Sequence, residues 1–270
     1  MISTIFASKA DTLKFLKKKI TKSKIEQIYD FMVEEWEKNE AEILNSVIIL
    51  FNDLSVIIRS SAIGEDTIEK SEAGNFTSIL NVNSASRTEL KKSIKTVINS
   101  YKKKKKSNSQ NQILIQKQTI NVKTSGVLFT RTPDIGAPYY IINFEDGTDT
   151  DSVTKGLIGN TIKIFRKTSY KNIPDKWKKL ILSIKEIEQI LGTDLLDVEF
   201  AITHKNIVIF QVRPLTTGKD LHINNIEKKI FHLIEKNKKK YRMLSRSVKM
   251  NNNKLIFSDM TDWNPAEIIG

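Results

Sequence analysis

The sequence contains no cysteine and only three histidines. Without cysteine the chain can form neither a disulfide framework nor a thiolate zinc site. The histidines, His204, His222 and His232, are scattered along the chain, so a histidine-based metal cluster is not expected. A metal in this protein would therefore have to be held by oxygen ligands.

Long apolar runs are missing as well. No stretch approaches the roughly 20 apolar residues that a membrane-spanning helix needs. The first residues are not followed by the basic and then apolar regions of a signal peptide. We therefore expect a cytoplasmic protein without a membrane partner, and 270 residues are enough for one large domain or two lobes with proper cores.

Positive charge is in excess, with a formal net charge of +13. Such an excess can indicate nucleic acid or an anionic membrane as a partner. The lysines are spread along the chain, however, and aromatic residues do not interleave with the lysine runs as in a groove for single strands. A nucleic-acid partner is therefore not expected, whereas a polyphosphate ligand would also benefit from the positive field.

The apolar spacing predicts a mixture of helices and short strands. Residues 8–47 are expected to be helical, with Ser23 and Glu26 at the spacing of a capping box before a second helix. Because the elements do not alternate in strict βαβ order, the fold class is predicted to be α+β, with two lobes around a cleft. Further helices are predicted at 87–101, 175–192 and 222–245, and strands at 56–58, 78–82, 113–116, 125–130, 139–144 and 162–165.

The stretch from Asp197 to Pro214 predicts a hairpin that carries polar groups where a buried strand should have none. Asp197 and Glu199 project from one face of the first strand, and Gln211 and Arg213 do the same on the second. Buried charge is costly unless it is paired or liganded. One interpretation is a structural salt bridge at a sheet edge. The other is a site for Mg²⁺ and polyphosphate, in which Glu199 and Gln211 offer oxygens and Arg213 neutralises phosphate.

A second candidate site begins where the strand at 56–58 ends in Arg59. Small hydroxylated residues and Gly74 follow, and they would let backbone N–H groups approach phosphate oxygens. The Gly-Lys-Ser/Thr of a P-loop is absent, and a plain surface loop is the alternative. Gln116 ends another apolar strand, at a predicted hinge where it could hydrogen-bond to a base.

Four segments in order carry a family pattern. They are IIRSSAIGEDTIEKSEAGNFTSILNV, ILIQKQTI, SGVLFTRTP and DVEFAITHKNIVIFQVRP. Together they resemble the nucleotide-binding domain of phosphoenolpyruvate synthase, pyruvate phosphate dikinase and rifampicin phosphotransferase, over about residues 5–217.

The resemblance implies an ATP-grasp fold, with ATP between two lobes and Mg²⁺ bound to its phosphates. In this family ATP pyrophosphorylates a histidine on a separate swivelling domain, AMP and phosphate are released, and the phosphohistidine passes its phosphoryl group to an acceptor. The expected domains are an N-terminal lobe at 1–116, a C-terminal lobe at 117–217, and a basic helix with the start of a truncated domain at 218–270.

The resemblance also implies roles for individual residues. Arg59 and Arg213 would be catalytic, because they balance charge on the transferred group. Glu199 would hold Mg²⁺ with help from Gln211. The implied ATP-binding set is Lys9, Arg59, Gly74, Ser78, Gln116, Glu199, Gln211 and Arg213.

The sequence also departs from the family pattern. Relatives often have Gly-Gly-Lys where this chain has Ala7-Ser8-Lys9, which puts Lys9 in doubt, since a lone lysine at a helix start is usually solvated. None of the histidines lies in the family's phosphocarrier motif. We therefore expect a fragment that binds ATP and depends on a phosphohistidine domain elsewhere in the full-length chain.

The last residues, FSDMTDWNPAEIIG, resemble a subfamily found with capsule and surface-polysaccharide genes. One member is the L-glutamine kinase that starts capsular phosphoramidate synthesis. The resemblance implies the glutamine amide as acceptor, with pyruvate or another small molecule as the alternative. A hypothesis of another class is a non-catalytic nucleotide-binding or nucleic-acid-binding module.

Overall fold

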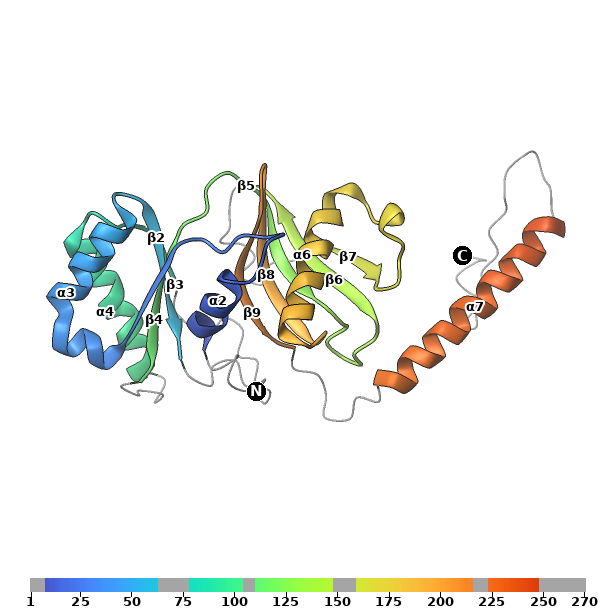
Figure 1. Cartoon of the computed structure of the whole chain (residues 1–270), viewed down its shortest axis with the longest axis horizontal. Helices are drawn as coiled ribbons and strands as arrows, with labels where there is room; N and C mark the ends of the chain where they lie inside the picture. Colours follow the sequence, from blue (N-terminus) through green and yellow to red (C-terminus); the bar gives the residue numbers. More distant parts are fainter. Residues whose placement is uncertain (1–7, 63–77, 104–109, 148–158, 216–222, 248–270) are drawn as a thin grey trace, which may run out of the picture. The chain divides into compact units, whose positions relative to one another are not determined.

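The computed structural model describes residues 8–62, 78–103, 110–147, 159–215 and 223–247. Backbone contacts divide the chain into two units, residues 1–221 and residues 222–270. In the described part of the first unit, the strands form one four-stranded and one five-stranded sheet, both antiparallel (Figure 1). The predicted α+β class is confirmed.

The four-stranded sheet has the order β1-β4-β2-β3, and α3 and α4 pack on one of its faces (Figure 1). Side chains that alternate along β2 and β4, among them Val56, Ile58 and Ile115, enter the core beneath these helices. The opposite face carries Arg59 and Gln116. The elements of this part are β1 Ile28–Met32, α3 Val33–Phe51, β2 Ser55–Ser61, β3 Ser78–Asn83, α4 Arg87–Lys103 and β4 Gln112–Lys117.

The five-stranded sheet has the order β7-β6-β5-β8-β9, and α6 packs on one of its faces. Trp177 of α6 packs edge-on against Phe144 and Phe200 of the sheet. Gly126 lets β5 and β6 approach closely, since a Cβ at this position would lie 2.2 Å from the Asn143 carbonyl oxygen. The elements are β5 Val122–Phe129, β6 Tyr139–Asp146, β7 Asn160–Phe165, the 3-10 turn η1 Tyr170–Asn172, α6 Asp175–Leu191, β8 Leu196–Thr203 and β9 Ile207–Pro214.

The helix α2, Lys9–Lys17, contacts both sheets. Leu13 and Leu16 are fully buried in the core of the five-stranded sheet. At its start, the Ala10 amide donates to Ser61 Oγ of β2 over 3.0 Å. The helix α2 is therefore part of the packing that joins the two sheets.

The prediction that residues 8–47 are helical, with a second helix capped at Ser23, is wrong in its middle. Residues 28–32 form the edge strand β1, which pairs with β4 from Ile28 opposite Gln116 to Met32 opposite Gln112. Ser23 caps no helix. The chain at Lys24 instead hydrogen-bonds to the edge of β9, through the Lys24 amide to Ile207 and the Ile209 amide to Lys24. Pairing with two sheets at once overrides the local helical spacing.

The other predicted elements are present, most of them with longer bounds, although α6 ends at Leu191 and β5 at Phe129, each one residue earlier than predicted. Gly192 ends α6 in the left-handed conformation, φ +68°, as its place in the sequence predicts. The described part of the second unit is one basic helix, α7 Ile223–Ser247. In the described ranges, no helix is long and apolar enough to span a membrane. The domain boundaries at residues 116 and 217 remain predictions.

Candidate functional site

The β8–β9 hairpin places the four polar residues of the Asp197–Pro214 stretch together. Val198 and Phe200 of β8 pack toward α6, so Asp197 and Glu199 face away from it. In the strand register Asp197 lies opposite Arg213, and Glu199 lies opposite Gln211. The Arg213 Nε donates to Asp197 Oδ2 over 2.6 Å. This close pair neutralises one carboxylate and leaves Glu199 as the next acidic group along the strand.

Arg59 connects the four-stranded sheet to this hairpin. One of its terminal nitrogens lies 3.6 Å from Glu199 Oε2, and its guanidinium carbon lies 5.8 Å from the centre of the Phe210 ring. The Arg59 Nε is buried and has no hydrogen-bond partner among the described residues. The guanidinium is thus held near Glu199 with donor capacity to spare, which is the state expected of a group that binds an anionic ligand.

Gln116 is the second under-satisfied group on the same sheet. Its side chain is completely buried, and neither the amide nitrogen nor the amide oxygen has a hydrogen-bond partner in the described part of the chain. Gln116 lies opposite Ile57 in the pairing of β4 with β2, and Ile57 and Arg59 share a face of β2. A buried amide without partners costs about 1–3 kcal/mol. Such a group calls for an explanation, and a ligand with one donor and one acceptor would satisfy it.

Two of the other predicted ATP-binding residues, Ser78 and Lys9, lie in the part of the chain that the structure describes. Ser78 begins β3 directly opposite Arg59 and is exposed. Lys9 is the first residue of α2, next to the N-cap Ser8, and it is half-buried. Gly74 lies outside the described residues. The structure therefore brings Arg59 together with Glu199 and Ser78, and it places Lys9 at the start of α2.

Two neighbours of the site were not among the residues assigned from the sequence. Asp197 was noted in the hairpin but given no role, although it makes the close ion pair with Arg213. Phe210 lies under the Arg59 guanidinium. Strand alternation would have placed Phe210 on the face opposite Gln211 and Arg213. The register shift between Glu199 and Phe200 leaves Phe210 as an extra residue of β9, and its side chain packs with Ala201 and Val208 instead.

Oxygen ligands for a cation are present in modest number. Among the residues that the structure describes, no three His, Cys, Asp or Glu side chains gather as a metal site. Glu199 and Gln211, directly opposite one another, offer a carboxylate and an amide oxygen. This donor set fits Mg²⁺, which is bound through one or two carboxylates and completes its shell with water and substrate phosphates.

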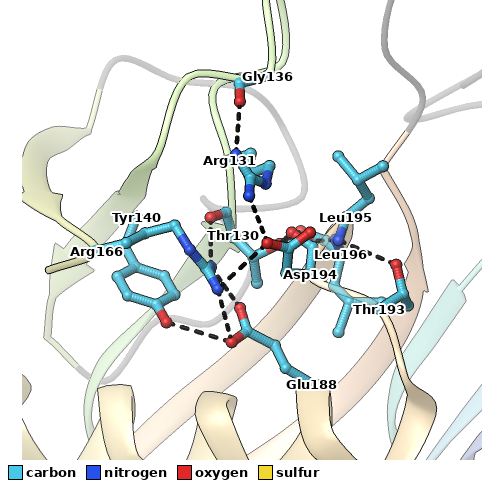
Figure 2. Close-up of polar contacts among 10 residues, drawn as sticks. All are labelled: Thr130, Arg131, Gly136, Tyr140, Arg166, Glu188, Thr193, Asp194, Leu195 and Leu196. Carbon is cyan, nitrogen blue, oxygen red and sulfur yellow. Dashed lines mark hydrogen bonds and ion pairs between the residues drawn. The ribbon is translucent and has the colours of Figure 1, made fainter. Parts of the chain in front are cut away.

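A second charged cluster lies at one end of the five-stranded sheet and on α6, and the sequence analysis did not predict it. It contains Arg131, Arg166, Glu188 and Asp194 (Figure 2). Arg166 donates two hydrogen bonds to the Glu188 carboxylate, of 2.6 and 3.0 Å, and the Tyr140 hydroxyl donates to the same carboxylate over 3.3 Å. Burial, and then Glu188, raise the pKa of Tyr140 well above its usual range. Of its members, only Arg131 lies in one of the four family segments, SGVLFTRTP. The others are far apart in the sequence, so no local pattern groups them.

The model of one protein family matches the sequence. It is described as pyruvate phosphate dikinase, AMP/ATP-binding domain, and it matches residues 6–169. No curated protein matches the sequence.

Solved structures also resemble the chain, at low sequence identity. The D-alanine–D-alanine ligase of Helicobacter pylori is 13% identical, with 77% of this chain and 51% of the ligase chain covered and a TM-score of 0.43. The dinucleotide-forming acetyl-coenzyme A synthetase 1 of Ca. Korarchaeum cryptofilum is 13% identical, with 77% and 92% covered and a TM-score of 0.49. This chain thus spans about half of the ligase.

Proposed function

The chain belongs to the pyruvate phosphate dikinase AMP/ATP-binding domain family, and from this premise we propose that it binds MgATP where β2 of the four-stranded sheet meets the β8–β9 hairpin of the five-stranded sheet. The family is an ATP-grasp family of ATP-dependent phosphotransferases. The proposed reaction is the AMP-forming one, in which ATP pyrophosphorylates a histidine of another domain.

The observation that carries this proposal is the approach of Arg59 to Glu199. A cation from one sheet and a carboxylate from the other lie 3.6 Å apart, and each is only partly exposed. A pair built only for stability would be expected to close to hydrogen-bond distance, as the Arg166–Glu188 pair does at 2.6 Å. The looser pair leaves both groups able to turn to a ligand that carries its own anion and cation, and MgATP is such a ligand.

Each group then has a distinct role in the proposal. Arg59 and Arg213 neutralise the phosphates and the charge that develops during transfer. Glu199 and Gln211 hold the Mg²⁺, which supplies charge neutralisation at the phosphoryl oxygens when it is bound. Ser78, opposite Arg59, and Lys9 contribute further contacts to the phosphates, and Gly74 belongs to the proposed set although it lies outside the described residues. The buried Gln116 amide pairs with the edge of the adenine ring.

The proposed lobes are residues 1–116 and 117–217, with residues 218–270 leading to a further domain. Phosphoryl transfer needs a phosphohistidine, which we assign to another domain of a longer chain. For the final acceptor we propose the amide of L-glutamine, in a capsular phosphoramidate pathway. This rests on the sequence of residues 257–270, which lie outside the described residues; pyruvate is the alternative acceptor.

Thermal unfolding with and without MgATP tests the nucleotide site. A ligand that binds only the folded protein stabilises it by about 2.7 kcal/mol at a hundredfold excess over Kd. We expect this shift in the wild type, its loss in Arg213→Gln, and its retention in Arg87→Gln. Arg87 is the matched control, because it hydrogen-bonds to Asn45 and to the Ala41 carbonyl of α3. The helix α3 packs on the face of the four-stranded sheet opposite Arg59.

A shift that survives in Arg213→Gln would contradict the assigned role of Arg213. The absence of any shift in a folded wild type would contradict MgATP binding by this chain. In a longer protein with the phosphohistidine domain, AMP release that depends on L-glutamine would support the proposed acceptor. AMP release that depends on pyruvate and not on L-glutamine would make pyruvate the acceptor instead.

A further inference from the structure

The charged cluster of Figure 2 has features that stability alone does not explain. It places two guanidinium groups and two carboxylates together, with the Arg131 side chain only 6% exposed. Removing such charges from water costs several kcal/mol per ion, and apolar side chains of the same volume stabilise a core equally well or better. The ionic arrangement instead supplies a fixed geometry, because hydrogen bonds between a guanidinium and a carboxylate form only in a few directions.

The groups fixed by this cluster include the backbone at the start of β8. Arg131 donates to Asp194 Oδ2 over 2.6 Å and to the Gly136 carbonyl over 3.0 Å. The neighbouring Thr130 donates its hydroxyl to the Asp194 carbonyl over 2.6 Å and accepts from the Leu196 amide over 2.7 Å. Side chain and backbone at the end of β5 thus hold residues 194–196 from two sides.

The next residues along β8 are those of the nucleotide site. Asp197, directly after Leu196, pairs with Arg213, and Glu199 follows two residues later on the same face. Because side chains alternate along a strand, a slip or rotation at Leu196 would turn both carboxylates toward the opposite face. A fixed start of β8 is therefore a condition for a fixed Glu199.

We propose that Arg131 and Asp194 are positioning residues, which set the register of β8 and thereby the carboxylate that holds Mg²⁺. This proposal rests on the proposed function and assigns a role to residues that take no part in the MgATP site itself. They act through the backbone of residues 194–196 and touch neither nucleotide nor metal.

The cluster offers a matched pair of isosteric substitutions for the test. Asp194→Asn removes the carboxylate that binds Arg131 beside β8. Glu188→Gln removes the carboxylate that hydrogen-bonds to Arg166, directly after β7, and to Tyr140 of β6. Both variants lose one negative charge that is paired with an arginine, so both are expected to unfold at lower temperature.

Hydrogen exchange of the full chain separates the two variants without any ligand. We expect Asp194→Asn to speed exchange of the backbone amides of residues 196–199, relative to β6, and Glu188→Gln to leave this ratio unchanged. Equal exchange at residues 196–199 in wild type and Asp194→Asn would overturn the proposal whether or not the chain binds ATP.

Nucleotide binding, measured by calorimetry well below the unfolding temperature, gives the second readout. We expect Asp194→Asn to lower the gain in ATP affinity that Mg²⁺ provides by about tenfold, as is usual when support for a metal ligand is lost. Adenosine affinity should stay unchanged, as should the Mg²⁺ gain in Glu188→Gln. A wild-type Mg²⁺ gain in Asp194→Asn, or an equal loss in Glu188→Gln, would overturn the positioning role. A wild type that binds no MgATP would instead contradict the proposed function. Hydrogen exchange at residues 196–199 would then still decide the role of Asp194.

Discussion

The two charged regions of the first unit differ in how completely their polar groups are paired. Around Arg166, both carboxylates and both guanidiniums make hydrogen bonds of 2.6–3.0 Å. Where β2 meets the β8–β9 hairpin, Arg213 is closely paired with Asp197, but Arg59 stays 3.6 Å from Glu199, and the Gln116 amide has no partner among the described residues. The difference indicates which region is built to hold the fold and which is built to receive a ligand.

The paired region should show the largest effect on stability. Replacing Arg166 by Met leaves Glu188 buried without its two-bond partner, and breaking a buried pair costs about 3–5 kcal/mol. Urea denaturation of wild type and variant measures this loss. Arg166→Met with wild-type stability would mean that the pair is exchanged for water at no cost, and the comparison between the regions would fail.

A substitution in the ligand-receiving region should have a small effect on stability and a large effect on MgATP affinity. Arg59→Met should change the free energy of unfolding by no more than about 1 kcal/mol, because the pair with Glu199 is loose. MgATP affinity should fall about 10–100-fold, since a hydrogen bond to a charged group contributes about 1.5–3 kcal/mol. Calorimetric titration measures the affinity, with Arg87→Met as the control. A stability loss as large as that of Arg166→Met would assign Arg59 to the fold.

Gln116 sharpens the comparison, since function and stability should move in opposite directions. Gln116→Leu removes an unpartnered buried amide, so we expect the protein to gain about 1 kcal/mol of stability and to bind adenosine more weakly. Gln118→Leu is the matched control, because the Gln118 amide already bonds to Asn81 on the surface. A destabilised Gln116→Leu would show that the amide serves the fold.

The smallest effect concerns acid stability. Burial alone would raise the pKa of Asp194, but the hydrogen bond from Arg131 and the charges of Arg131 and Arg166 outweigh it and lower the pKa. A lowered pKa contributes stability above the unfolded value of about 3.9 and loses it as the pH falls further. The stability difference between wild type and Asp194→Asn, from urea midpoints at pH 2.5–6, should shrink below about pH 4. The effect is modest because Asp194 is 38% exposed. A difference that does not change with pH would show that Asp194 is not ionised in the pair.

Much of the fold could be predicted from the sequence because its signals are local. The β8–β9 hairpin followed from alternation and a short polar turn, and the end of α6 followed from Gly192. The strand at 28–32 could not be predicted, because its helical spacing is overridden by pairing with β4. Edge pairing depends on where a distant strand lies, which no local pattern contains.

For the site, the sequence by itself determined the types of residue and their grouping along the chain. Asp197, Glu199, Gln211 and Arg213 are close in sequence, so strand alternation alone placed them on one face. Only the tertiary structure decided that Arg59 of the other sheet reaches Glu199, and that Arg166, Glu188 and Asp194 meet. Their positions are set by how sheets and helices pack, and packing arises from many weak contacts summed over the whole core.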